Sequence, residues 1–168
     1  MTDWPAYFAH LARLVRPGGY VECQEVTVAP MWLHEDESGR VTMPSPLRHQ
    51  QAMAEAAAAK GLDLGCASKL AEMMRAAGLE VVVEKAYRWP LGEWAAERGE
   101  ESTRRIGRVM VEETIPVAVH GALGAICKGV RTDEEIEVLQ RELLEHCARE
   151  QDGVYTPYYV VVGRRLEE

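Results

Sequence analysis

Polar residues in the segment 20–28 (YVECQEVTV) are the first candidates for chemistry. The segment is rich in β-branched and aromatic residues and is bounded by glycines and a proline, which predicts a strand. Side chains of a strand alternate between its two faces. We expect one face to carry Glu22, Gln24 and Val26, and the other to carry Cys23, Glu25 and Thr27. A carboxylate at the strand end can orient or deprotonate a nucleophile, but ordinary hydrogen-bonded or solvated strand-end residues have the same pattern, so both interpretations stay open.

Four residues form the predicted substrate-binding set. Ligands of open α/β sheets bind beyond the carboxyl ends of the strands, which places Gln24, Glu25 and the following Trp32 nearest to a substrate. His120 lies in a helical region further along the chain and can act as a base, because histidine titrates near neutrality. A partly buried structural histidine is the alternative for His120. No catalytic residue is assigned.

Two tryptophans and four cysteines have less specific signals. Trp89 and Trp94 flank a Pro-Leu-Gly turn, where large rings either pack or line an apolar pocket. The cysteines are irregularly spaced and form no CxxC pair, which argues against both a disulfide framework and a zinc site. His146 and the adjacent Cys147 lack a second pair of ligands. We expect reduced, mostly buried thiols and no bound metal.

The elements that position these residues follow from periodicity and from capping signals. Asp3 and Pro5 begin a helix that Pro17 ends, and Gly78 follows the last helix before the second strand. The expected elements are a helix from Asp3 to Val15, a strand at 20–28, a loop at 29–46 that suits a lid, helices at 47–60 and 68–77, a strand at 79–88, a helical region at 100–130, a helix at 132–150 and a strand at 154–164.

Two of these expectations depend on single residues. Pro116 removes one backbone hydrogen bond from the region 100–130, so we expect two helices there instead of one. Thr132 followed three residues later by Glu135 is a capping box, which predicts the start of the helix at 132–150.

Composition and charge exclude several classes of protein. The chain has 168 residues, 47% of them hydrophobic, which fits a single globular domain over 1–168. A net charge of -8 with scattered arginines disfavours nucleic-acid binding. The best apolar stretch, Ile115 to Ile126, falls short of the roughly 18 residues that cross a bilayer. No signal-peptide pattern is present at the N-terminus, so we expect an intracellular protein without a membrane partner.

Several segments, taken in order, resemble the second half of class I S-adenosylmethionine-dependent methyltransferases. In these enzymes an L-x-P-G-G turn leads into the fifth strand, and Leu14 to Tyr20 (LVRPGGY) is similar to it. The segments Glu22 to Glu25, Leu70 to Gly78, Trp89 to Trp94 (WPLGEW) and Tyr155 to Arg165 look like the fungal LaeA-like subgroup.

The resemblance implies a partial sheet in which one strand edge is unpaired. The expected fold is α/β, a partial methyltransferase sheet with strands in the order 5-7-6, the last strand antiparallel, and a helical insertion at about 93–150. The outer edge of the fifth strand then has no neighbour, and sheet edges are seldom left open. We expect a homodimer, a partner chain or a rearranged helix to cover it.

The cofactor-binding half is missing from the resemblance. Leu62 to Cys66 (LDLGC) copies the opening of a glycine motif, but helix-forming residues precede it, which predicts a helix-to-helix connection. The resemblance implies S-adenosylmethionine as cofactor and this chain as the substrate side of a methyltransferase, inactive without a cofactor-binding half. The alternative is a non-catalytic methyltransferase-like module for binding or dimerisation. A small-molecule acceptor and a regulatory role in secondary metabolism are both compatible with the resemblance.

Overall fold

The computed structural model describes residues 3–27, 33–42, 48–94, 101–147 and 153–167. The described strands form one five-stranded sheet, and helices accompany it, so the α/β class is confirmed. Contacts divide the chain into two compact units. The first unit comprises Met1–Thr27, Asp63–Tyr87 and Pro157–Glu168, and the second comprises Val28–Leu62 and Arg88–Thr156. The assignment of all 168 residues to one domain stays a prediction.

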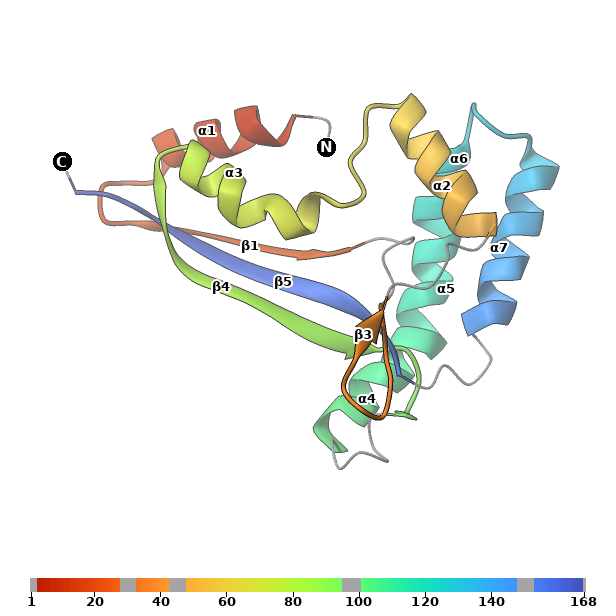
Figure 1. Ribbon diagram of the computed structural model, residues 1–168. Helices are drawn as coiled ribbons and strands as arrows, with labels where there is room; N and C mark the ends of the chain where they lie inside the picture. The colour runs from red at the N-terminus through yellow and green to blue at the C-terminus, as the bar shows by residue number, and fades with distance from the viewer. Residues whose placement is uncertain (1–2, 28–32, 43–47, 95–100, 148–152, 168) are drawn as a thin grey trace. The chain divides into compact units, whose positions relative to one another are not determined.

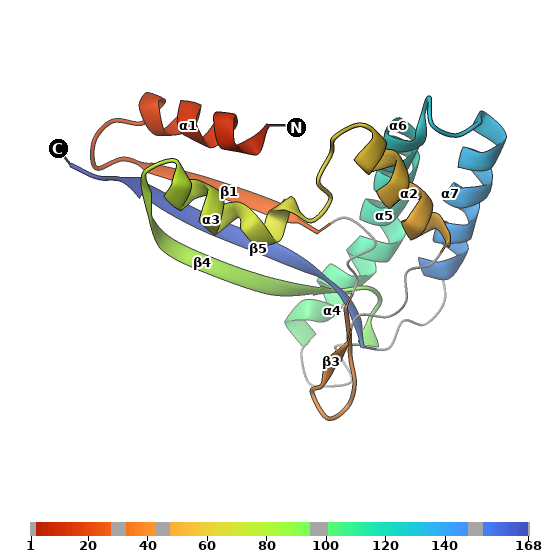
Figure 2. The same cartoon turned by 45° about the horizontal axis from the view of Figure 1, so that its top comes forward.

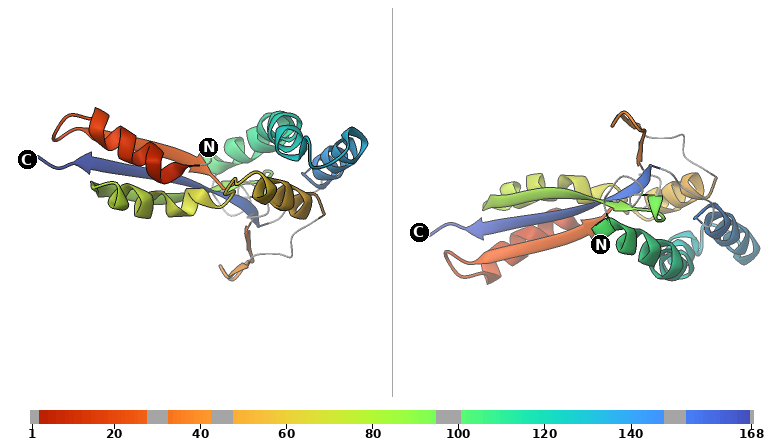
Figure 3. Two further views of the ribbon diagram at one scale, coloured as in Figure 1. Left: turned by 90° about the horizontal axis from the view of Figure 1, so that it is seen from above. Right: turned by 90° about the horizontal axis from the view of Figure 1, so that it is seen from below.

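The first unit is a three-stranded sheet with helices on one face. Strand β5 pairs antiparallel with β1 from Tyr20↔Arg164 to Val26↔Tyr158, and it also pairs with β4, which runs in the opposite direction (Figures 1 and 3). The terminal strand therefore lies between the other two. The elements are α1 (Trp4–Leu14), β1 (Tyr20–Val26), a 3-10 turn (Cys66–Lys69), α3 (Leu70–Ala76), and most of β4 (Leu79–Pro90) and β5 (Val154–Arg165).

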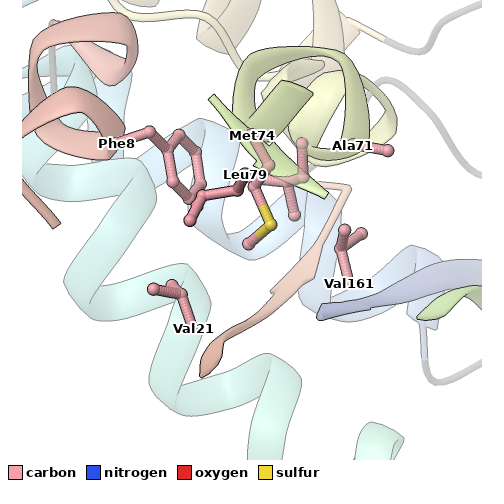
Figure 4. Close-up of a cluster of buried hydrophobic side chains, with 7 residues drawn as sticks. Phe8, Val21, Ala71, Met74, Leu79 and Val161 are labelled. Atoms are coloured by element: carbon pink, nitrogen blue, oxygen red, sulfur yellow. The ribbon is translucent and has the colours of Figure 1, made fainter. Parts of the chain in front are cut away.

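The core of the first unit lies between the helices and the sheet. Helices α1 and α3 run side by side over the same face of the sheet (Figures 1 and 2). Phe8 from α1 points toward Met74 and Leu79, and Val161 of β5 lies beneath them (Figure 4). The buried cluster consists of Phe8, Val21, Leu70, Ala71, Met74, Leu79 and Val161. Burial of these apolar side chains is the main force that holds the two helices on the sheet.

Both ends of α1 are capped. The carboxylate of Asp3 accepts a hydrogen bond from the Ala6 backbone N–H at 2.9 Å, which confirms the predicted N-cap. At the other end, Arg165 Nη1 donates to the backbone carbonyls of Ala12, Arg13 and Val15, at 3.2, 3.2 and 2.9 Å. A cation at a helix C-terminus satisfies carbonyls that have no partner within the helix. The last strand therefore fixes the end of the first helix.

The second unit is mainly helical. Helix α2 packs against α6 and α7, and the side chain of Gln140 on α7 donates to the carbonyl of Val119 at 3.3 Å. Thr132 and Glu135 form the predicted capping box of α7: the Glu135 N–H donates to Thr132 Oγ1 at 3.2 Å, and the Thr132 N–H donates to Glu135 Oε2 at 2.9 Å. The elements are β2 (Leu33–Glu35), β3 (Val41–Thr42), α2 (Arg48–Ala59), α4 (Glu101–Val109), α5 (Ile115–Ala118), α6 (Gly124–Cys127) and α7 (Asp133–Cys147).

The expectation of two helices at 100–130 is wrong. Helical backbone continues without interruption from Glu101 to Cys127, because π-helical turns at Met110–Thr114 and Val119–Leu123 join α4, α5 and α6. Pro116 is the second residue after the first π turn, which Ile115 separates from it. A π turn shifts the hydrogen-bond register, which accommodates a residue without an N–H inside a continuous helix.

The continuous helix is longer than the apolar stretch expected from the sequence. Thr103–Cys127 has 25 residues and a mean hydropathy of 1.3 over its most apolar window, so by length and composition it is able to span a membrane. Core helices of water-soluble proteins pass the same test. The apolar stretch expected from the sequence, Ile115 to Ile126, is therefore only part of a longer helix.

A short hairpin replaces part of the expected loop at 29–46. Strands β2 and β3 pair antiparallel, and β2 also pairs with the start of β5 through Leu33↔Tyr155. The turn between them is closed by Asp36, whose carboxylate accepts hydrogen bonds from the Ser38 and Arg40 N–H groups at 2.9 and 3.0 Å. A hydrogen bond from the Ser38 hydroxyl, together with those from the Arg40 and Ser38 N–H groups, holds the pKa of Asp36 below its usual range.

Candidate functional site

The carboxyl-terminal part of β1 carries two of the predicted site residues on opposite faces. Gln24 lies on the face away from α1 and α3, where Tyr158 Oη donates to its side-chain oxygen and its amide nitrogen donates to Glu22. Glu25 lies on the other face with Cys23. The predicted alternation of side chains between the two faces of the strand is confirmed. Gln24 and Glu25 therefore lie on different sides of the sheet.

Glu25 lies close to two thiols. The pKa of Cys23 is raised to about 11, chiefly by burial, then by the Glu25 carboxylate and by electrostatic interaction with Cys66. Burial and Glu25 likewise raise the pKa of Cys66, which belongs to the turn Cys66–Lys69. Both thiols are therefore protonated near neutral pH and are poor nucleophiles. Of this group, only the Glu25 carboxylate is suited to act as a base.

Thiol alkylation tests this environment. At pH 8, iodoacetamide should modify Cys23 about 100-fold more slowly in the folded chain than in urea, because a pKa of about 11 in place of 9.0 reduces the thiolate fraction by that factor. Cys147, with a pKa raised by burial to about 12, should react more slowly still. Mass spectrometry of the alkylated peptides measures both rates. Equal rates for Cys23 in the two conditions would show that its thiol is not buried beside Glu25.

The other two predicted site residues have different outcomes. Trp32 lies outside the described residues. His120 belongs to the π turn Val119–Leu123 and has an exposed side chain, so the alternative of a partly buried structural histidine is wrong. Val119 and Leu123 of the same turn are buried, whereas His120 lies on the solvent-exposed side of the helix.

The two tryptophans of the Trp-Pro-Leu-Gly-Glu-Trp segment differ in role. Trp94 Nε1 donates to the carbonyl of Val154 at 2.9 Å, so its ring packs against the start of β5. Trp89 instead lines a cavity together with residues of α4. Of the two alternatives for this pair, packing therefore applies to Trp94 and the pocket applies to Trp89.

The contact between His49 on α2 and His146 on α7 was not predicted from the sequence. His49 is only 2% exposed, and its ring centre lies 6.0 Å from that of His146. The pKa of His49 is lowered to about 4, chiefly by burial and secondly by the neighbouring His146, while Glu142 acts in the opposite direction. The two residues are 97 positions apart in the sequence, so no local pattern indicates their contact.

This pair predicts acid sensitivity. His49 has a pKa of about 4 when folded and an ordinary value of 6.5, so the unfolded chain binds more protons between these pH values and folding loses stability as pH falls through that window. The free energy of unfolding should be about 2 kcal/mol lower at pH 5 than at pH 7.5, at about 1.4 kcal/mol for each pKa unit. Urea titrations at both pH values measure the difference. His49→Gln should reduce it, whereas the matched change His120→Gln at an exposed site should leave it intact.

The segment that copies a glycine motif connects two helices, as predicted. Leu62 to Cys66 follows α2 and leads into the turn Cys66–Lys69 without a preceding strand. The carboxylate of Asp63 accepts from the Gly65 N–H at 2.9 Å and pairs with Lys69 at 2.7 Å. Gly65 has a φ of -95°, which any residue adopts. This turn therefore closes on itself and offers no cradle for a nucleotide-like ligand.

Among the described residues, no group of three or more histidine, cysteine or acidic side chains is placed to hold a metal ion. Neither the models of protein families nor the curated proteins include a match to this sequence.

Proposed function

We propose that this chain is the substrate-side half of an S-adenosylmethionine-dependent methyltransferase of class I. The observation that carries the proposal is the position of β5, which lies between β1 and β4 and runs antiparallel to β1. A last strand inserted antiparallel between two earlier strands is what the 5-7-6 portion of the methyltransferase sheet requires. The helices α1 and α3, which precede β1 and β4, cover one face, as alternating α and β elements do.

The described segment that copies a glycine motif does not fit the cofactor. Adenosyl groups of this fold family lie on a glycine-rich turn between a strand and a helix, and the one segment of similar sequence, Leu62 to Cys66, follows a helix and uses Asp63 within its own turn. The cofactor-binding surface must then come from other residues than these. Glu25 at the end of β1 is the residue we assign to the acceptor side, because it is a carboxylate among protonated thiols.

The outer edge of β1 supports the need for a second half. Thr27 N–H donates to the Pro157 carbonyl and Arg165 N–H donates to the Gly19 carbonyl, so odd-numbered residues of β1 direct their backbone groups toward β5. The N–H and C=O groups of Tyr20, Glu22, Gln24 and Val26 point the other way. No described strand pairs with that side. An upstream strand, a partner chain or a second copy is able to pair there.

The same edge favours the alternative function, a non-catalytic methyltransferase-like module for binding or dimerisation. In a homodimer, the β1 strands of two copies pair with each other, and the outward N–H groups are protected without any other chain. The two functions therefore differ in when these amides become protected.

Residue-resolved hydrogen exchange with calorimetry tests the proposal. The chain alone should show no heat on titration with S-adenosylmethionine, and the amides of Tyr20, Glu22, Gln24 and Val26 should exchange faster than those of Val21, Cys23 and Glu25. Addition of the cofactor-binding half of a LaeA-like methyltransferase should protect the even-numbered amides. Glu22→Pro removes an outward N–H and should prevent this protection, since proline is tolerated at a strand edge.

Three results would oppose the proposal. Tight binding of S-adenosylmethionine by the chain alone would show that a cofactor site exists within it. Even-numbered amides that are already protected, with a dimeric mass in solution, would support the dimerisation module. Even-numbered amides that exchange equally fast with and without the added half would show that β1 does not receive a fourth strand.

A further inference from the structure

We propose that a cavity beside Trp89 in the second unit binds a small planar aromatic carboxylate. The cavity has a volume of about 340 Å³, within the range of sites that hold small molecules. Its lining residues are Trp89, Arg105, Ile106, Val109, Met110 and Thr114.

The walls of the cavity are held in place by backbone contacts. Trp89 lies near the end of β4, and the following Leu91 is fully buried and donates its N–H to the Val154 carbonyl at 2.9 Å. Gly92 N–H donates to the Gly107 carbonyl at 3.3 Å, which ties α4 to the Pro-Leu-Gly turn. The indole and the helix therefore keep their spacing without a ligand. A preformed site binds more tightly because less ordering is needed on binding.

The surface of the cavity is apolar although much of it faces solvent. Ile106 and Val109 are 38% and 44% exposed, and they stand beside the Trp89 indole and the Met110 side chain. A flat aromatic ring placed there would remove this apolar surface from water and would stack on or against the indole. Met110 adapts its shape to an aromatic partner better than a branched side chain does.

The π turn shapes the same wall. Met110 and Thr114 are the first and last residues of the turn Met110–Thr114, and both line the cavity. Turns of this kind are rare in proteins, and those that occur are often found at functional sites.

Among the described residues that line the cavity, Arg105 is the only cation, and it favours a negatively charged ligand. Arg104 pairs with Glu93 at 3.3 Å, but Arg105 has an exposed side chain and makes no ion pair with any residue that the structure describes. A guanidinium offers two parallel N–H donors that match a carboxylate. Because Arg105 pairs with no acidic side chain among the described residues, we expect it to favour an aromatic acid over a neutral or cationic aromatic compound.

This site goes beyond the proposed methyl transfer, since its residues belong to one compact unit and no cofactor is involved. The test is calorimetry of the whole chain, without S-adenosylmethionine, using naphthalene-2-carboxylate and its neutral analogue naphthalene-2-carboxamide as probes. Failure of these probes to bind would leave the assignment of the β1–β5–β4 sheet untouched.

Three variants give the expected pattern. Arg105→Gln should weaken binding of the carboxylate about tenfold or more while changing that of the carboxamide by less than about twofold. Val109→Trp should fill the cavity and remove binding of both probes. Arg108→Gln, the matched control on the same helix outside the cavity, should leave both affinities unchanged.

Specific outcomes would overturn the site. Equal loss of carboxylate binding in Arg105→Gln and Arg108→Gln would indicate non-specific attraction to positive charge. Because a tryptophan at position 109 can disturb the helix, the NMR signal of the Trp89 indole N–H in the unmodified chain gives an independent readout. It should shift on addition of naphthalene-2-carboxylate more than that of Trp94. Absence of such a shift, or absence of binding by either probe, contradicts the proposal.

Discussion

Replacement of Phe8 by alanine is expected to lower the free energy of unfolding of the first unit by about 3 to 5 kcal/mol, the usual cost of removing a fully buried phenylalanine ring. Phe8 has no exposed surface and is the residue of α1 that reaches the centre of the cluster around Met74 and Leu79 (Figure 4). Its ring also stacks on Trp4 at 5.8 Å and meets Tyr7 edge-on at 5.6 Å. Loss of the ring leaves a cavity that the three-stranded sheet cannot close.

Leu14→Ala is the matched control for this prediction. Leu14 lies on the same helix but is 68% exposed, so its truncation should change the free energy of unfolding by less than about 0.5 kcal/mol. Urea unfolding followed by circular dichroism measures both variants. If Phe8→Ala lowers the free energy of unfolding no more than Leu14→Ala does, α1 does not pack on the sheet. The first unit would then lack the helix that a methyltransferase sheet has before its fifth strand.

Elements fixed by nearby residues are those that the sequence predicted well. The cap of α1 needs only Asp3 and Ala6, and the capping box of α7 needs only Thr132 and Glu135. In both cases the partners lie three residues apart, so the interaction is visible in the sequence itself. The strand β1 was predicted for the same reason, since its alternation is a property of a few consecutive residues.

Features that depend on distant partners were missed. The hairpin β2–β3 is held at β5 by the pairing of Leu33 with Tyr155, and no local signal marks such a short strand. The continuous helix through Pro116 depends on a π turn, which has no sequence signature. Short strands and unusual turns take their stability from tertiary contacts, which override local propensity.

In the candidate site, too, local features could be predicted from the sequence and tertiary contacts could not. The opposite orientation of Gln24 and Glu25 could be predicted because it follows from strand geometry alone. The proximity of Glu25 to Cys66 could not, because the turn Cys66–Lys69 is brought to β1 only by the folding of α3 onto the sheet. The cavity at Trp89 was foreseen only as one of two alternatives, since the choice between packing and pocket depends on the distance of α4 from the Pro-Leu-Gly turn.

That distance can be tested directly through Gly107, at the point where α4 meets this turn. A β-carbon at position 107 would overlap the carbonyl oxygen of Gly92 and lie 3.2 Å from the ring of Pro90. Because the first contact is with backbone, the helix must move away. Gly107→Ala should therefore lower the free energy of unfolding by about 3 kcal/mol through overpacking and loss of the hydrogen bond from Gly92 N–H to the Gly107 carbonyl. Thermal unfolding measures the loss.

Gly121→Ala separates this clash from the helix propensity of the new residue. Gly121 lies in the same continuous helix, and a β-carbon there meets nothing within 4 Å. Alanine is the better helix former, so this variant should gain about 0.5 to 1 kcal/mol while Gly107→Ala loses stability. Opposite signs for one substitution at two positions of one helix can come only from the contact with the Pro-Leu-Gly turn. Stabilisation by both would show that α4 does not rest on that turn, and the cavity beside Trp89 would then have no fixed wall.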